Sequence, residues 1–312
     1  MGRPSMDKSG LVAWLALALT WAAPGAAQDA SWLAAPPGGD FNDAANWTPA
    51  TVPTGTASFG MSTGTTITFS SDTTLGGWTF NAGASNYTFA SDHALMFTGG
   101  GIVLNDGSAD ITNNNLLQFS HASTAGSASI TDTNNGVLQF IDTSTASNAV
   151  ITNHGSLEFY DATRAGSANI TNTGTLYFFG GSTADNAIIT NNGSLQFATR
   201  GTAGNASITN GAGASTDFSG SSGPLNDGQL SAGSIAGNGQ FYLGANQLTV
   251  GGNNLSTTVN GVISDCGPSG SSCSSAGATG GTLIKTGTGT LTLTSANLYT
   301  GATTVDAGTL NV

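Results

Sequence analysis

The sequence has few charged side chains, and among these very few are basic, which excludes several kinds of protein. Asp, Glu, Lys and Arg together make up 7% of the 312 residues, whereas an average soluble domain has about 25%. Only 5 residues are Lys or Arg, and the formal net charge is −12. Binding to a phosphate backbone needs clustered basic side chains, so we expect no nucleic-acid partner.

Long hydrophobic runs are also scarce, and the one present lies near the N-terminus. The run LVAWLALALTWAA at residues 11–23 follows Arg3 and Lys8 and precedes several small residues. At about 13 residues it is too short to span a bilayer, and its layout is that of a secretory signal peptide cleaved after Ala27. A buried N-terminal helix is the alternative. We therefore leave residues 1–27 out of the fold and expect an exported protein.

Cysteine is equally rare, with two residues in the Gly- and Ser-rich stretch SDCGPSGSSCSSAG. In an exported protein, Cys266 and Cys273 most simply close a local disulfide. Free or metal-bound thiols are the alternative, but a metal site would need further Cys or His residues close by in the sequence, and there are none. We expect neither a metal nor another cofactor.

The middle of the sequence contains an internal repeat. The Ile of a recurring Ile-Thr pair returns after 19 residues in four of five steps and after 21 in the other. Each unit continues with a Leu-x-Phe motif, and an Ala follows the Phe by six positions. The Phe column consists of Phe119, Phe140, Phe159, Phe178 and Phe197, with Phe218 in a degenerate last copy.

This repeat unit predicts short β-strands rather than helices. Its Gly, Thr and Asn residues are poor helix formers, and its apolar residues alternate with a period of two. A single unit cannot bury its own apolar side, so successive units must stack and place like residues over like. The prediction is an all-β fold, a right-handed parallel β-helix, or solenoid, with coils of roughly 19 residues.

A polar column accompanies the apolar ones. We expect its members to adopt the left-handed backbone of a corner and to hydrogen-bond from coil to coil. A role as ligands to a bound group is the alternative. The column consists of Asn113, Asp132, Asn153, Asn172, Asn191 and Asn210.

The C-terminal stretch GGTLIKTGTGTLTLTSANLYTGATTVDAGTLNV resembles the autotransporter-associated β-strand repeat of bacterial type V secretion passengers. The Trp- and Pro-containing stretch at residues 31–60 resembles the opening of the same passengers. The matching positions of the repeat are Leu283, Lys285, Gly287, Gly289, Leu291, Leu293, Asn297, Tyr299, Thr300, Gly301, Thr303, Val305 and Gly308.

The resemblance suggests how the chain is organised. We divide it into a signal peptide (1–27), N-terminal β-helix coils (28–108), the 19-residue repeat β-helix (109–220), β coils with a Gly/Ser-rich disulfide loop (221–280) and the autotransporter-associated β-strand repeat (281–312).

The resemblance also implies a function. It implies a secreted or surface-displayed passenger that serves structural display, adhesion or biofilm contact. Its expected partners are host or neighbouring-cell surfaces, extracellular glycans, and an outer-membrane translocator barrel that this sequence does not contain. The alternatives are a β-helical carbohydrate-active enzyme, a carbohydrate-binding protein, and a truncated, non-functional fragment of a larger autotransporter.

Catalytic chemistry has little support in the sequence. Glycoside hydrolysis needs a pair of carboxylates on one face, and Glu158 has no acidic neighbour at its position in the other repeat units. The histidines His93, His121 and His154 occupy different positions of the repeat. We therefore expect a protein that is not an enzyme.

One group of aromatic residues does not belong to the repeated core columns. Tyr160 and Phe179 follow the Phe column by one position, as Ile141 does, and Tyr177 precedes Phe178. On stacked coils Tyr160, Tyr177 and Phe179 would form a candidate contact strip of the kind that binds sugars or partner surfaces. The alternative is that the column after Phe turns inward at the corner and joins the core.

Overall fold

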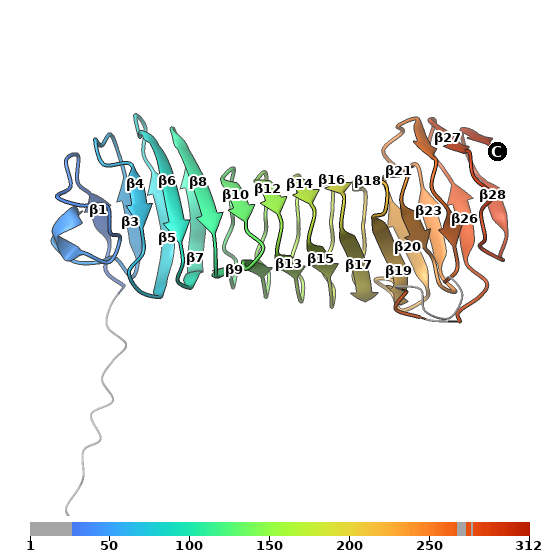
Figure 1. The fold of residues 1–312 in the computed structure, drawn as a ribbon, viewed down its shortest axis with the longest axis horizontal. Helices are drawn as coiled ribbons and strands as arrows, with labels where there is room; N and C mark the ends of the chain where they lie inside the picture. The colour runs from blue at the N-terminus through green and yellow to red at the C-terminus, as the bar shows by residue number, and fades with distance from the viewer. Residues whose placement is uncertain (1–26, 267–272, 276) are drawn as a thin grey trace, which may run out of the picture.

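The computed structural model describes residues 27–266, 273–275 and 277–312, and it forms one elongated solenoid (Figure 1). The fold is an all-β parallel solenoid of about 12 turns that lie roughly 21 residues apart, with almost no helix. The parallel β-helix predicted from the repeat is therefore confirmed. The predicted signal peptide, apart from Ala27, lies outside the described residues.

Three parallel sheets form the sides of the solenoid, and we call them sheets A, B and C. Sheet A has 13 strands, in the order β2 (Trp47–Thr48), β1 (Ala30–Trp32), β3 (Thr56–Phe59), β5 (Thr73–Phe80), β7 (Leu95–Leu104), β9 (Leu116–Phe119), β11 (Val137–Phe140), β13 (Ser156–Phe159), β15 (Thr175–Phe178), β17 (Ser194–Thr199), β19 (Ser215–Ser221), β22 (Gln240–Tyr242) and β25 (Ile263–Ser264).

Sheet B has 12 strands, and sheet C adds a third side toward the C-terminus. Sheet B runs in the order β29 (Thr309–Asn311), β27 (Thr290–Leu293), β24 (Thr257–Val259), β21 (Ser234–Gly237), β18 (Ser207–Asn210), β16 (Ile188–Asn191), β14 (Asn169–Asn172), β12 (Val150–Asn153), β10 (Ser129–Asp132), β8 (Ser108–Asn113), β6 (Asn86–Ser91) and β4 (Thr66–Thr68). Sheet C contains β20 (Gln229–Ala232), β23 (Gln247–Val250), β26 (Thr282–Lys285) and β28 (Thr303–Val305).

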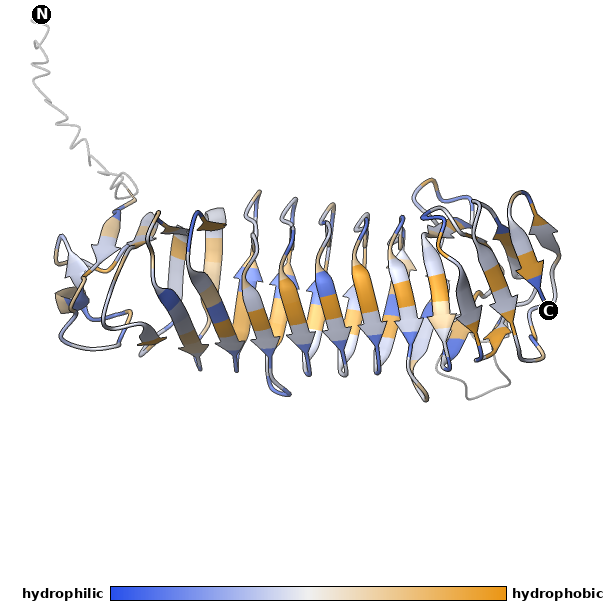
Figure 2. Ribbon diagram, turned by 90° about the horizontal axis from the view of Figure 1, so that it is seen from above, coloured by the Kyte–Doolittle hydropathy of each residue, from blue (hydrophilic) through white to orange (hydrophobic). Residues whose placement is uncertain are grey.

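The repeat array, residues 109–220, stacks identical residues in register. Leu138 pairs with Leu157, and Phe140 pairs with Phe159, in the parallel ladder between β11 and β13. The Phe column is fully buried, and successive rings lie 4.7–5.1 Å apart between centroids with interplanar angles of 4–13°. Figure 2 shows the resulting hydrophobic stripes on the central strands. The repeated Leu-x-Phe motif therefore forms the core of this array.

The polar column lies inside the solenoid, where its members are buried. The Asn153 Nδ2 donates to Asn172 Oδ1 at 2.6 Å, and the Asn172 Nδ2 donates to Asn191 Oδ1 at 2.8 Å. The expected coil-to-coil hydrogen bonding is confirmed. The expected left-handed backbone is wrong, because positive φ angles occur elsewhere, as at Asp142 (62°) and Asp161 (56°). These aspartates lie in the turns that follow the strands of sheet A, whereas the amides end the strands of sheet B, as Asn153 ends β12.

The N-terminal end is closed by a segment that departs from the parallel pattern. The 3-10 helix η1 (Ala44–Asn46) leads into β2, which pairs antiparallel with β1 and forms the end strand of sheet A. Trp47 and Phe41 are buried there, and the Trp47 Nε1 donates to the Phe41 carbonyl oxygen at 2.8 Å. A very short, antiparallel end strand leaves little exposed edge for pairing with other chains.

Two buried carboxylates hold the C-terminal coils together. Asp217 accepts hydrogen bonds from the Ser274 N–H and Oγ, both at 2.7 Å. Asp265 accepts from the N–H groups of Gly280, Gly281 and Thr300 at 3.0–3.1 Å, and from the Thr300 Oγ1 at 2.7 Å. Hydrogen bonds to charged groups are about twice as strong as neutral ones. The two aspartates therefore fasten the segment after the cysteines to the coils on either side.

Candidate surface contact site

The residues after the Phe column face outward in the structure. Phe179 is 40% exposed, and Ile141 and Tyr160 are partly exposed. The alternative that this column turns inward and joins the core is therefore wrong. Each residue follows a four-residue strand of sheet A, at the point where the chain leaves the sheet and turns. The turn aims the side chain away from the interior.

Two of these residues touch each other across neighbouring coils. The rings of Tyr160 and Phe179 lie 5.9 Å apart between centroids at an interplanar angle of 65°, an edge-to-face arrangement. Such pairs contribute about 0.5–1.5 kcal/mol beyond the burial of their area. The two rings therefore form a fixed aromatic surface rather than two independent side chains.

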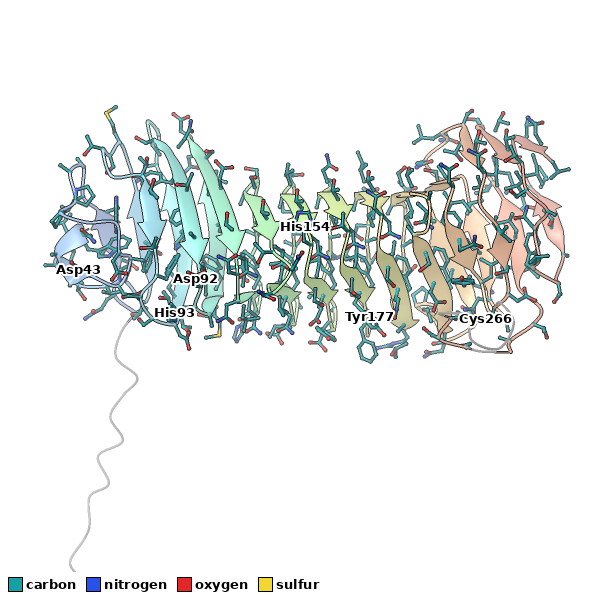
Figure 3. The ribbon with its side chains drawn as sticks, in the orientation of Figure 1. Asp43, Asp92, His93, His154, Tyr177 and Cys266 are labelled. Carbon is teal, nitrogen blue, oxygen red and sulfur yellow. A yellow bond between two sulfur atoms is a disulfide. The ribbon has the colours of Figure 1, made fainter. Side chains whose placement is uncertain are left out.

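Tyr177 is the third member of the contact strip and lies on the outer face of β15 (Figure 3). Its register neighbours are Glu158 on β13 and Gln196 on β17. A hydrogen-bonded row leads up to it, because the Gln118 Nε2 donates to Gln139 Oε1 and the Gln139 Nε2 donates to Glu158 Oε2, each at 2.8 Å. The strip therefore combines aromatic faces with a row of amide groups and one carboxylate.

The electrostatics of the strip are set by that carboxylate. Burial raises the pKa of the Tyr160 hydroxyl, and the negative charge of Glu158 raises it further. The phenol therefore stays protonated across the physiological range and remains able to donate a hydrogen bond. The Ser156 Oγ donates to Glu158 Oε1 at 2.8 Å, which fixes the orientation of the carboxylate.

The His, Cys, Asp and Glu side chains of the described residues are dispersed over the solenoid. The described residues contain no group of three or more His, Cys, Asp or Glu residues that could hold a metal ion. The three histidines lie apart: His93 is 3.7 Å from Asp72, His121 is 4.0 Å from Asp142, and the His154 Nδ1 is 2.7 Å from the Thr173 Oγ1.

One short motif in the N-terminal coils has the spacing of a serine hydrolase. The sequence GMSTG at residues 60–64 places Ser62 at the position of a nucleophile. Its Oγ donates to the Leu33 carbonyl oxygen at 2.8 Å, and none of the three histidines contacts it. Ser62 therefore serves the local structure of its turn.

The predicted cysteine pair lies close to the end of sheet A. Cys266 and Cys273 are joined in the structure with their Cα atoms 5.7 Å apart, and Figure 3 labels Cys266 among the C-terminal coils. The segment after Cys273 covers Asp217, which is 1% exposed although its register neighbour Gln196 is on the outer face. The sequence did not reveal this contact, because Asp217 and Ser274 are far apart along the chain.

The C-terminal repeat has clear physical reasons for several of its residues. Gly287 and Gly308 adopt φ angles of 69° and 74°, and a Cβ at either position would lie within 2.4 Å of a backbone oxygen. Lys285 is 1% exposed, and its Nζ donates to the carbonyl oxygens of Thr286, Gly287 and Ala307. The lysine therefore satisfies carbonyl groups where two coils turn.

Comparisons with known proteins identify this same segment. The family model described as passenger-associated-transport-repeat matches residues 283–312. No curated protein and no solved structure matches the chain. Among the described residues, no helix has the length and apolar character needed to cross a membrane. The repeat and the solenoid together fit an autotransporter passenger with repeats, as the resemblance of the C-terminal stretch indicated.

Proposed function

We propose that this protein is a non-catalytic, exported autotransporter passenger that displays its contact strip for adhesion or biofilm contact with glycans on neighbouring surfaces. The observation that carries the proposal is the exposure of the aromatic pair. The rings of the Phe column are fully buried, whereas Phe179 is 40% exposed and rests against Tyr160. Exposed aromatic patches with polar borders are typical of binding sites.

The chemistry of the strip favours a neutral glycan over other partners. Aromatic faces pack against the apolar faces of sugar rings, and amide groups hydrogen-bond to hydroxyls. Gln139 and Gln196 supply amides on either side of Glu158 and Tyr177. The formal net charge of −12 repels anionic partners such as nucleic acids or acidic polysaccharides.

A matched set of variants tests this proposal. Two single variants of purified residues 28–312, Tyr160→Ala and Phe179→Ala, are compared with the unaltered protein on a panel of immobilised neutral and acidic glycans. Ile188→Ala is the control, because Ile188 is 57% exposed on β16 of sheet B. We expect the strip variants to lose binding to neutral glycans at least tenfold and the control to retain it. Equal binding by the unaltered protein, the strip variants and the control would contradict the proposal.

The absence of catalysis is part of the proposal and has its own test. Glu158 is the carboxylate of the strip, and its two oxygens already accept hydrogen bonds from Gln139 and Ser156. Hydrolysis of a glycosidic bond needs a second carboxylate about 5–9.5 Å away. We expect no release of reducing sugar from any glycan that the protein binds. Turnover that Glu158→Gln abolishes would show that the protein is an enzyme.

A further inference from the structure

The interior polar column has one break. In the rest of the column each side-chain oxygen accepts from the amide Nδ2 of the preceding coil, as between Asn172 and Asn191 at 2.8 Å. Asp132 accepts in the same way from the Asn113 Nδ2 at 2.6 Å. It has no Nδ2 of its own to pass the pattern on to Asn153, its register neighbour on β12.

The atoms on both sides of this break lack partners. The Oδ2 of Asp132 and the Oδ1 of Asn153 are buried, and neither has a hydrogen bond. Both atoms are acceptors when the aspartate is ionised, so an ionised Asp132 leaves two buried oxygens unsatisfied. Buried polar groups without partners are rare in native proteins because they lose their hydration without replacement.

A single proton repairs this break. We infer that Asp132 is protonated in the folded solenoid and that its Oδ2–H donates to Asn153 Oδ1. The stability of this coil therefore depends on pH. The protonated carboxyl then continues the row of side chains, with one oxygen accepting and the other donating. It supplies one proton, whereas the amides of the column, such as Asn153 and Asn172, each donate both to the next side chain and to a backbone carbonyl oxygen.

The surroundings of Asp132 favour the protonated form. Burial raises the pKa of its carboxyl to about 7, although the Asn113 amide and the Ser156 N–H lower it, and the charge of Glu158 adds to the increase. His154 contacts Asp132 through its backbone N–H, at 2.8 Å from the carbonyl oxygen, while its ring faces Thr173. Glu158 is thus the charged group among the described residues that acts on Asp132, and it is an anion.

The sign of the pH effect follows from this difference between the folded and unfolded states. An aspartate in an unfolded chain has a pKa of about 3.9, and the folded value is about 7, so folding takes up a proton between these limits. The stabilisation is complete below about pH 4 and is lost as the pH rises through 7. Mild acid therefore stabilises this coil, and alkaline solution destabilises it.

The substitution Asp132→Asn supplies the missing donor permanently. Unfolding of residues 28–312 is followed by urea or heat from pH 4 to pH 9 for the unaltered protein, Asp132→Asn and the control Asp110→Asn. Asp110 is an exposed residue of β8. We expect the melting temperature of the unaltered protein and of the control to fall between pH 4 and pH 8 more steeply than that of Asp132→Asn. We also expect Asp132→Asn to melt several degrees higher at pH 8.5.

A spectroscopic measurement gives a second readout that needs no stability comparison. In the unaltered protein at pH 5.5, infrared spectra should show the carbonyl stretch of one protonated, buried carboxyl group, which disappears with a midpoint near pH 7 and is absent in Asp132→Asn. No such band, or identical pH profiles for all three proteins, would overturn the inference. Saturable stabilisation by added Ca²⁺ that EDTA reverses and Asp132→Asn abolishes would also overturn it, since a cation would then bridge the two oxygens.

Discussion

The N-terminal coils, residues 28–108, and the repeat array both have aromatic cores, but they pack their rings differently. In the array, the rings of the Phe column lie nearly parallel, at 4–13°. In the N-terminal coils, Trp32 meets Trp47 at 79°, Phe59 meets Trp78 at 80°, and Trp78 meets Phe97 at 87°. Edge-to-face packing is thus common in one region and stacking is the rule in the other.

The difference follows from what each region must do. A repeat that advances by one strand spacing places equal residues directly above one another, so their rings stack in parallel. Within the described residues, β2 and β1 form the end of sheet A, and residues of other shapes cover the core there. Trp47, Phe41 and Trp78 fill that space from different segments. Repetition extends a solenoid, whereas a mixed aromatic cluster closes it.

Removal of the central ring of this cluster should have the largest effect on stability. Trp78 is fully buried and packs against Phe89 at 4.1 Å and Phe97 at 4.9 Å between ring centroids. We expect Trp78→Ala to lower the free energy of unfolding by about 3–5 kcal/mol, as for other large-to-small core substitutions. Hydrogen exchange should show the loss in the N-terminal coils, with the array still protected. Uniform loss of protection along the chain would mean that the two regions unfold as one unit.

A substitution in the interior polar column should lower the free energy of unfolding by less than Trp78→Ala does. Asn172→Ala removes the Nδ2 that donates to Asn191 Oδ1 at 2.8 Å and to the Ser194 carbonyl oxygen at 3.1 Å. Buried acceptors left without a donor cost about 1–3 kcal/mol. Urea unfolding should show a decrease in this range. The control is Asn169→Ala, at an exposed position of the same strand. An equal decrease in the control would show that the hydrogen bonds of the interior polar column do not stabilise the array.

A third effect on stability is expected in the C-terminal coils, where a covalent link adds to the packing. Cys266 and Cys273 are 7 residues apart, and closing so short a loop stabilises a fold by about 2.5 kcal/mol at most. Mass spectrometry of the exported protein should show this disulfide, and the double substitution to Ser should lower the melting temperature slightly. Two free thiols in the exported protein would contradict the predicted pairing.

The repeat was sufficient to predict the interior of the array. Residues that recur at equal spacing have to occupy equal positions in stacked coils, which is why the Phe column and its burial could be predicted. The left-handed corner was assigned to the wrong column, because Asn153 and Asp161 both suit such a backbone by residue type. Register, and not residue type, places Asn153 inside and Asp161 at the turn.

Contacts outside the period could not be predicted in this way. Asp265 binds Thr300, and Asp217 binds Ser274, yet no spacing in the sequence relates the members of either pair. The exposure of Phe179 could not be predicted either, because a residue directly after a strand can point to either side of the corner. These features depend on how the chain folds back on itself, which periodicity does not describe.

In the proposed function, one array is both scaffold and contact surface, and two neighbouring residues separate these roles. Phe178 is fully buried between Phe159 and Phe197, whereas Phe179 is 40% exposed. The measurement is the glycan affinity and the unfolding free energy of Phe178→Ala and Phe179→Ala side by side. We predict that Phe178→Ala loses about 3–5 kcal/mol of stability, while Phe179→Ala loses only about 0.5–1.5 kcal/mol, the contribution of its ring pair with Tyr160, and weakens binding at least tenfold. A Phe179→Ala protein that binds glycans as tightly as the unaltered chain would contradict the proposed role of the array as a contact surface.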